Sequence, residues 1–282
     1  MKFQIALLTA LAMIAFASNS LLNRLALGQD AIDPTSYTTI RLVSGAAMLF
    51  LLASLQRQQN APILRGSWLS AAFLFLYAVT FSFAYLSLST GSGALILFGS
   101  VQVTMIIVAL RSGEKPLSME WIGLFLALGG LVYLVFPGLT APPLLGSGLM
   151  AIAGVAWGFY TIRGRGSGNP LGDTAGNFVY SVPMVSLLLL VSFGNISVSS
   201  SGVMYAVLSG ALASGVGYVI WYAALRGLTT TRAATVQLSV PVIAAWSGVV
   251  FLAEDVSARL VIAGMLILGG IALAVTSRGK KA

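Results

Sequence analysis

The stretch WIGLFLALGGLV at residues 121–132 returns as VIAGMLILGGIA at residues 261–272, 140 positions further on and without a gap. Each copy follows an acidic residue: Glu114 stands fifteen residues before the first glycine pair, and Glu254 stands the same distance before the second. A chain that repeats itself over this distance indicates two related halves. The alternative is that two apolar helices ending in Gly-Gly look alike without a common origin.

A second, weaker match supports the duplication. Ala15-Phe16-Ala17 and Ala156-Trp157-Gly158 stand at an offset of 141. The first triplet also resembles a signal-peptide cleavage site, because it follows a basic start and an apolar run. Cleavage there would leave nine membrane spans and would remove the partner of the second triplet, so we favour an uncleaved first helix.

The composition requires lipid as the main solvent of the chain. Of its 282 residues, 58% are hydrophobic and 8% are charged, whereas soluble domains carry about 25% charged residues. The chain has no cysteine and no histidine, which excludes disulfides, thiolate chemistry, histidine-ligated metals and histidine bases. No cofactor, metal site or catalytic residue is predicted.

Apolar runs long enough to cross the membrane recur through the whole chain. Crossing takes about 20 residues at 1.5 Å per residue. The sequence predicts an all-α integral membrane protein with ten transmembrane helices, at residues 4–23, 35–56, 67–88, 91–110, 120–136, 146–162, 172–193, 202–225, 230–252 and 258–276.

The basic residues orient these helices, because cytoplasmic loops collect Lys and Arg. With the N-terminus inside, only Arg24 and Arg259 lie in outer loops, and Arg41 falls within the second span. Both termini are then cytoplasmic in a multi-pass protein of a bacterial inner (plasma) membrane. Scattered between spans, these charges do not predict nucleic-acid binding. The twelve inner residues are Lys2, Arg57, Arg65, Arg111, Lys115, Arg163, Arg165, Arg226, Arg232, Arg278, Lys280 and Lys281.

Five helices per half is an odd number, so the second half must enter the membrane upside down. We expect a first repeat at residues 1–137 and a second, inverted repeat at residues 145–282. Inverted repeats are typical of transporters, because a pseudo-two-fold axis in the membrane plane supplies matched gates. One copy contains both halves, so a monomer suffices, and a dimer stays open.

The chain resembles the drug/metabolite transporter superfamily, specifically its ten-helix EamA-type branch. The resemblance rests on Ala156-Trp157-Gly158, on the run 237–241 (QLSVP), and on the two acidic residues with their glycine pairs. The run 97–102 (LFGSVQ) and the aromatic helices 3 and 8 look most like the bacterial aromatic amino acid exporters. The resemblance implies export from cytoplasm to periplasm by alternating access, with substrate held between the halves.

Polar and aromatic side chains within the spans are the candidate substrate ligands. A polar group in hydrocarbon is costly unless it is satisfied, and aromatic faces can hold a planar ring or a cation. Alternatively, the polar residues bond neighbouring helices, and Trp221 lies near enough to a helix end to be an interfacial anchor. The predicted substrate-binding residues are Asn19, Tyr77, Thr80, Phe81, Gln102, Trp157, Tyr160, Tyr218, Trp221, Gln237 and Ser239; Ser20 and Thr104 are further polar candidates.

Small residues at positions 154, 158, 210 and 214 are spaced to let helix backbones approach closely. Glycines in helix 8 can also supply a gating bend. Arg41 is the one embedded charge expected; it could attract a carboxylate at an outer vestibule, pair with a buried partner, or extend its charge to the membrane surface.

All seven acidic residues fall in loops or at helix ends. Coupled pumps usually need a midplane acid or histidine for a proton relay, so we expect facilitated export or exchange. The leading hypothesis is a secondary transporter that exports amino acids, aromatic or large neutral ones. The alternatives are export of another small metabolite or drug, such as a nucleobase or sugar derivative, and a membrane enzyme, for which no nucleophile–base pair or metal cluster is visible. The partners expected are a small-molecule substrate and the lipid bilayer.

Overall fold

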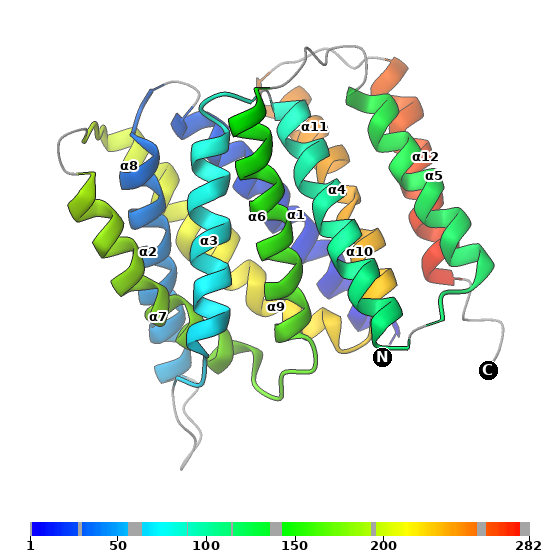
Figure 1. The fold of residues 1–282 in the computed structure, drawn as a ribbon, viewed down its shortest axis with the longest axis horizontal. Helices are drawn as coiled ribbons and strands as arrows, with labels where there is room; N and C mark the ends of the chain where they lie inside the picture. Colours follow the sequence, from blue (N-terminus) through cyan, green and yellow to red (C-terminus); the bar gives the residue numbers. More distant parts are fainter. Residues whose placement is uncertain are drawn as a thin grey trace.

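The computed structural model describes residues 2–27, 30–55, 64–88, 90–113, 115–135, 143–192, 196–252 and 258–276. Glu114 and Glu254, which precede the two repeated stretches, lie outside these ranges, as do the basic residues Arg57, Arg278, Lys280 and Lys281. Arg259 lies within the last range, but its side chain is outside the description. The described segments are helical and lie along one bundle axis (Figure 1). The strand-like pairing found among them is one antiparallel bridge between Ile32 and Val198.

The first half contains five helices, in agreement with the predicted spans. α1 begins at one end of the bundle, and α12 of the second half ends at that same end (Figure 1). The helices of the first half are α1 (Lys2–Leu27), α2 (Pro34–Leu55), α3 (Trp68–Ala84), α4 (Thr90–Arg111) and α5 (Ser118–Val135).

The second half also has five spans, two of which are interrupted. The eighth span is split by a π-helical segment, η3, and the ninth is split after Gln237. The elements are α6 (Leu144–Gly164), α7 (Pro170–Val191), α8 (Ser200–Leu208), η3 (Ser209–Val216), α9 (Gly217–Leu225), α10 (Thr230–Gln237), α11 (Ser239–Leu252) and α12 (Ala258–Thr276).

Pro241 explains the break in the ninth span. Proline has no N–H, and its ring clashes with the carbonyl four residues earlier, which belongs to Gln237. α10 ends at that residue, and Leu238 forms a turn before α11. Because the first half has Val101 at the matching position, α4 continues unbroken from Thr90 to Arg111.

The outer surface of the bundle is apolar, as a lipid-facing surface must be. Five helical stretches are long and apolar enough to cross a membrane, and shorter apolar helices account for other spans. Large side chains such as Phe125 (64% exposed), Val250 (71%) and Met265 (63%) face outward. The chain is therefore a multi-pass membrane protein of ten helices.

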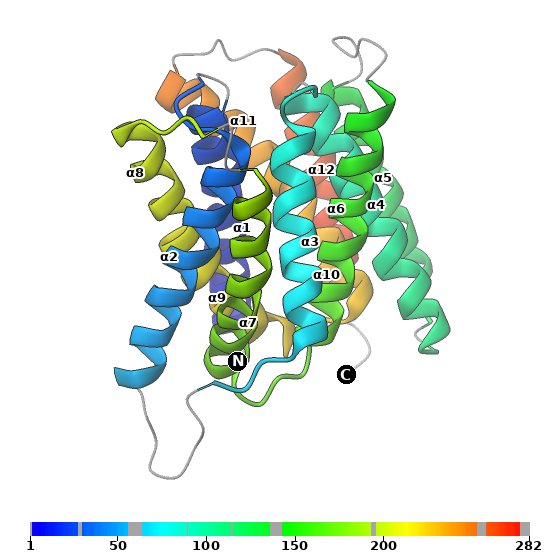
Figure 2. The same cartoon turned by 60° about the vertical axis from the view of Figure 1, so that its left-hand side comes forward.

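The most extensive helix pairings join the two halves. α5 packs along α12, and α2 packs along α7; Figure 2 shows α2 beside α7. Two further helix pairs correspond in the same way: α3 packs on α6, and α1 packs on the eighth span, which consists of α8, η3 and α9. Contacts that exchange partners in this way are produced by a two-fold axis between two inverted repeats.

The second glycine of each duplicated Gly-Gly pair lies in the contact between α5 and α12. A Cβ on Gly130 would lie 2.8 Å from the Cβ of Leu266 and 2.9 Å from Cγ1 of Ile267, and a Cβ on Gly270 would lie 2.8 Å from the backbone N of Ala127. Ala127 and Ile267 stand 140 residues apart, as do the two glycines. The two contacts are therefore equivalent: the pseudo-two-fold axis relates one to the other within an antiparallel helix pair.

We predict that Gly270→Ala destabilises the bundle whereas Gly269→Ala does not. The added methyl of the first variant meets the Gly123 carbonyl oxygen at 2.5 Å, whereas a Cβ on Gly269 has nothing within 4 Å. Overpacking costs about 1–3 kcal/mol, while alanine in a helix interior is favoured over glycine by about 1 kcal/mol. Thermal unfolding in detergent measures the difference; equal melting temperatures for the two variants would contradict the close contact.

Candidate functional site

A small, partly open pocket lies between the two halves, near the middle of the bundle. Three helices of each half supply its walls, and the cavity volume is about 30 Å³. A space of this size holds only about one or two water molecules. The walls are Phe16, Asn19 and Ser20 of α1, Tyr77 and Phe81 of α3, Leu97 and Phe98 of α4, Trp157 of α6, Tyr218 of α9 and Val240 of α11.

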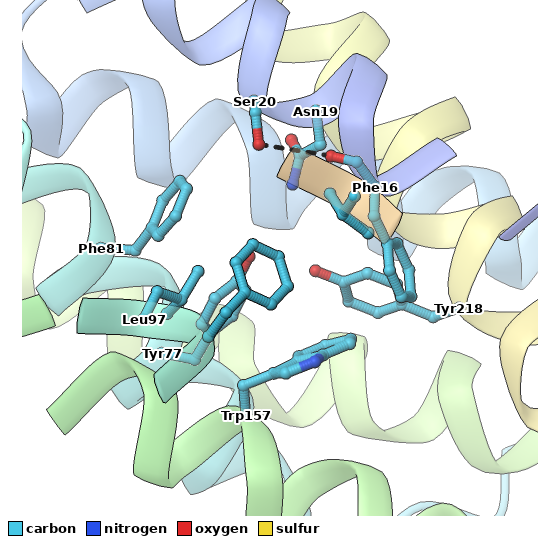
Figure 3. Close-up of a pocket in the computed structure, with 10 residues that line it drawn as sticks. Phe16, Asn19, Ser20, Tyr77, Phe81, Leu97, Trp157 and Tyr218 are labelled. Carbon is cyan, nitrogen blue, oxygen red and sulfur yellow. Dashed lines mark hydrogen bonds between the residues drawn. The ribbon is translucent and has the colours of Figure 1, made fainter. Parts of the chain in front are cut away.

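Four aromatic rings of the pocket are arranged around the pseudo-two-fold. Phe16 meets Trp157 edge to face with ring centroids 5.3 Å apart, Tyr77 lies 5.1 Å from Trp157, and Phe16 lies 5.7 Å from Tyr218. Figure 3 shows the rings of Tyr77, Trp157 and Tyr218 turned toward a shared space. Edge-to-face and tilted contacts in this range are favourable ring geometries.

The same offset of 141 relates these rings in pairs. Phe16 corresponds to Trp157, and Tyr77 corresponds to Tyr218. The Tyr77–Trp157 contact therefore becomes the Phe16–Tyr218 contact when the halves are exchanged. The pocket consequently lies on the axis that relates the repeats, where an alternating movement of the halves would open it first to one side and then to the other.

Five of the predicted ligands line this pocket, and three others stand close behind it. The ring of Tyr160 is 5.7 Å from that of Trp157, and the ring of Trp221 is 5.8 Å from that of Phe16. Trp221 is fully buried, so the alternative that it anchors the chain at the membrane interface is wrong. Gln237 accepts a hydrogen bond of 2.7 Å from the Trp157 indole N–H. The five in the wall are Asn19, Tyr77, Phe81, Trp157 and Tyr218.

Three predicted ligands remain, and they, like Gln237, bond within or between helices. Gln102 donates to the Ala234 carbonyl and so joins α4 to α10, while the amide of Gln237 also donates to its own helix at Ala233. Thr80 donates to the Leu76 carbonyl on its own helix, and Ser239, the first residue of α11, donates to the Val236 carbonyl of α10. The structure thus places Thr80, Gln102, Gln237 and Ser239 in the framework around the pocket and not in its wall.

Phe16, Leu97, Phe98 and Val240 line the pocket but were absent from the predicted set. Each is apolar in an apolar helix, so nothing in its chemistry distinguishes it from a packing residue. The offset between the halves is the signal that could have found Phe16, because Phe16 is the counterpart of Trp157.

Arg41 lies directly behind the pocket, fully enclosed in the bundle at 1% exposure. Its Nε donates to Ser214 Oγ and its Nη2 donates to the Tyr218 hydroxyl, both at 3.1 Å. The guanidinium carbon stands 5.5 Å from the ring centre of Tyr77. Burial excludes the alternative in which this charge extends to the membrane surface.

The small residues of η3, in the eighth span, let this segment approach α2 closely enough for Arg41 to reach its hydrogen-bond partners. A Cβ on Gly210 would lie 2.0 Å from the Arg41 carbonyl oxygen, so only glycine permits this approach of η3 to α2. Gly154 and Gly158 give α6 the same access to α4, at Leu97 and Thr104. The predicted close helix contacts are confirmed. π-helical turns are frequent at functional sites, and this one presents Ser214 to the cation.

Ten membrane helices in two inverted halves, with an aromatic pocket on their pseudo-two-fold axis, define a membrane transporter built from a duplicated unit. The chain belongs to the EamA-like transporter family, which matches residues 4–136 and again residues 144–276. This family places it in the drug/metabolite transporter superfamily.

Curated relatives and a solved structure are similar to the chain over most of its length. An uncharacterized protein of Pseudomonas aeruginosa is 52% identical over 272 residues, which cover 96% of this chain and 94% of the relative. The uncharacterized transporter YoaV of Bacillus subtilis is 22% identical over 256 residues, covering 86% and 88% of the two chains. A solved crystal structure matches with a TM-score of 0.81 over 100% of both chains at 20% identity, which shows the same fold.

We predict that the Trp157–Gln237 hydrogen bond couples the two residues energetically. Trp157→Phe keeps a ring but leaves the buried Oε1 of Gln237 without this donor, and Gln237→Leu removes the amide. Because each single variant leaves a buried group unpaired, the double variant should be less destabilised than the sum of the two, by about 1 kcal/mol. Chemical unfolding in mixed micelles gives the four stabilities.

The matched control combines Trp157→Phe with Thr80→Val. Thr80 bonds its own helix at Leu76, so this pair should be additive. Additivity in the Trp157–Gln237 pair as well would contradict the coupling.

Proposed function

We propose that the protein is a secondary transporter that exports amino acids, aromatic or large neutral ones, from cytoplasm to periplasm across a bacterial inner membrane. The observation that carries this proposal is the ring of aromatic side chains on the axis between the two halves. Aromatic faces suit a planar side chain, and the Asn19 amide and the nearby Arg41 guanidinium suit the polar end of an amino acid.

The orientation follows from the positive-inside argument. With both termini cytoplasmic, the end of the bundle where α1 begins and α12 ends is the inner side. We propose that residues 1–137 and 145–282 rock against each other about the pocket. A cavity of about 30 Å³ is far smaller than an amino acid, so substrate enters only when the rings move apart as one side opens.

Export of aromatic amino acids is tested with purified protein in proteoliposomes. Vesicles are loaded with radiolabelled phenylalanine, tryptophan, threonine or alanine, and efflux is followed. We expect phenylalanine and tryptophan to leave faster than from protein-free vesicles, and Trp157→Ala to reduce their efflux roughly tenfold, because one aromatic wall is worth about 1.4 kcal/mol.

Trp246→Ala is the matched control, because Trp246 is 42% exposed on the outer face of α11. It should leave efflux unchanged. If none of the four amino acids moves, the amino acid proposal is wrong. If threonine and alanine move as fast as the aromatic pair, the aromatic selectivity is wrong.

A nucleobase is the second candidate substrate, because a planar ring beside the Asn19 amide is also the chemistry of base recognition. A competition experiment distinguishes a nucleobase substrate from an amino acid substrate. Excess adenine or uracil should leave phenylalanine efflux unchanged if the amino acid proposal holds.

Efflux should not depend on a pH gradient. Among the residues that the structure describes, the acids lie at helix ends; Glu120, in the first turn of α5, is buried but pairs with Arg232 at 3.4 Å. A proton relay through the pocket would need a titratable acid there. We expect equal efflux rates with and without an imposed gradient, within about twofold, and a strong acceleration by the gradient would show that protons are coupled to transport.

A further inference from the structure

Arg41 is a buried cation that its surroundings do not neutralise. Two of its nitrogens donate to neutral hydroxyls, of Ser214 and Tyr218, and its Nη1 is buried with no hydrogen-bond partner in the described part of the chain. The ion pairs found in that part join other residues. Asp33, the acid on the same helix end, is eight residues away, which is about 12 Å along the axis.

Asp33 is also already engaged. Its carboxylate accepts from the backbone N–H groups of Ser36 and Ser197. A desolvated cation without a counter-charge is costly in a bundle that is surrounded by lipid. The Arg41 guanidinium therefore attracts an anion.

The charge stands next to the pocket rather than in a remote part of the bundle. The guanidinium carbon is 5.5 Å from the Tyr77 ring centre and 6.0 Å from that of Phe81, and the Tyr218 hydroxyl accepts from Nη2. All three of these aromatic residues line the cavity. Only the thickness of this aromatic wall separates the cation from the pocket, and the wall must move when substrate enters.

The fold does not require a charge at this place. α2 and α7 are corresponding helices of 22 residues that begin at Pro34 and Pro170. The chain from Trp157 to Pro170 is five residues shorter than the chain from Phe16 to Pro34, so the offset falls from 141 to 136 at these helices. In this register Arg41 corresponds to Asn177, a neutral side chain that accepts a hydrogen bond from the Ser67 backbone at 2.9 Å. One half of the protein thus packs the equivalent position without a cation, which favours a role in recognition.

We propose that Arg41 makes the pocket select organic anions, namely an aromatic ring that carries a carboxylate. This inference rests on the proposed export function. The free Nη1 donates to a carboxylate oxygen of the substrate, while the rings of Tyr77, Trp157 and Tyr218 enclose the aromatic group. No acid of the described chain faces the pocket to bind an ammonium group, so the carboxylate is required and the amino group is not.

Three solutes that share one ring test this selection on the unaltered protein. Efflux from proteoliposomes at neutral pH is measured for phenylalanine, for 3-phenylpropanoate, which lacks the amino group, and for phenylalaninamide, which lacks the carboxylate. Leak from protein-free vesicles is subtracted. We expect the two carboxylates to be exported and to compete with each other, and phenylalaninamide to be neither exported nor an inhibitor.

The variants assign the selection to Arg41. Arg41→Gln should lower efflux of both carboxylates roughly tenfold to a hundredfold, as expected for loss of one charged hydrogen bond. Arg41→Lys should restore part of that loss, because the charge is kept. Arg111→Gln, at the exposed end of α4, is the matched control and should transport normally. Thermal unfolding in detergent verifies that each variant is folded.

The outcomes separate this inference from the export function. If phenylalaninamide leaves as fast as phenylalanine, or folded Arg41→Gln exports normally, carboxylate selection is wrong although amino acid export stands. If 3-phenylpropanoate does not move while phenylalanine does, the amino group is required and the inference is also overturned. If neither carboxylate moves, both proposals fail. If Arg41→Gln does not fold, the efflux of the three solutes by the unaltered protein still tests carboxylate selection.

Discussion

Hydrocarbon offers no hydrogen-bond partner to a polar side chain, and this constraint determines the interior of the bundle. Several of the buried polar groups are therefore bonded to groups on neighbouring helices. Gln102 reaches the backbone of α10, the Trp157 indole reaches Gln237, and the Ser209 hydroxyl donates to Asn19. These bonds surround a narrow aromatic space; the first and third join the two halves, and the second joins α6 to α10 within the second half.

The second determinant is the duplication itself. Because the halves are inverted copies, the residues nearest the axis meet their own counterparts: Phe16 meets Trp157, and the Gly130 contact with α12 is repeated by Gly270. Symmetry supplies the framework, and departures from it supply the specificity. Pro241 breaks one helix where Val101 does not, and Arg41 places a charge in one half only. Both departures lie close to the pocket.

Much of the fold was predictable from the sequence, because span length, the Lys and Arg distribution and the repeated Gly-Gly pairs each reflect a strong constraint. The π-helical segment Ser209–Val216 was not predictable, since glycine density is equally compatible with a straight, tightly packed helix. Gln102 was a candidate ligand because an amide in a membrane helix needs a partner. The sequence does not say whether that partner is substrate or a neighbouring carbonyl, and the structure provides the carbonyl of Ala234.

The pocket was partly predictable for the same reason. Trp157, Tyr77 and Tyr218 carry polar atoms on large rings within spans, which marks them as candidates. Phe16 and Leu97 carry no such mark, and only the approach of distant helices brings them to the cavity. Burial of Arg41 also depends on a tertiary contact, the approach of Gly210 to α2, which a single sequence does not reveal.

Access to the pocket from the two sides of the membrane is the most direct measurement of alternating movement about the axis. The chain has no cysteine, so Ser20→Cys gives a single thiol in the pocket wall. A membrane-impermeant thiol reagent is applied from each side of oriented proteoliposomes, with and without tryptophan. Alternating access predicts labelling from both sides and protection by tryptophan on both. Labelling from one side only, unaffected by tryptophan, would contradict a substrate pocket shared by two moving halves.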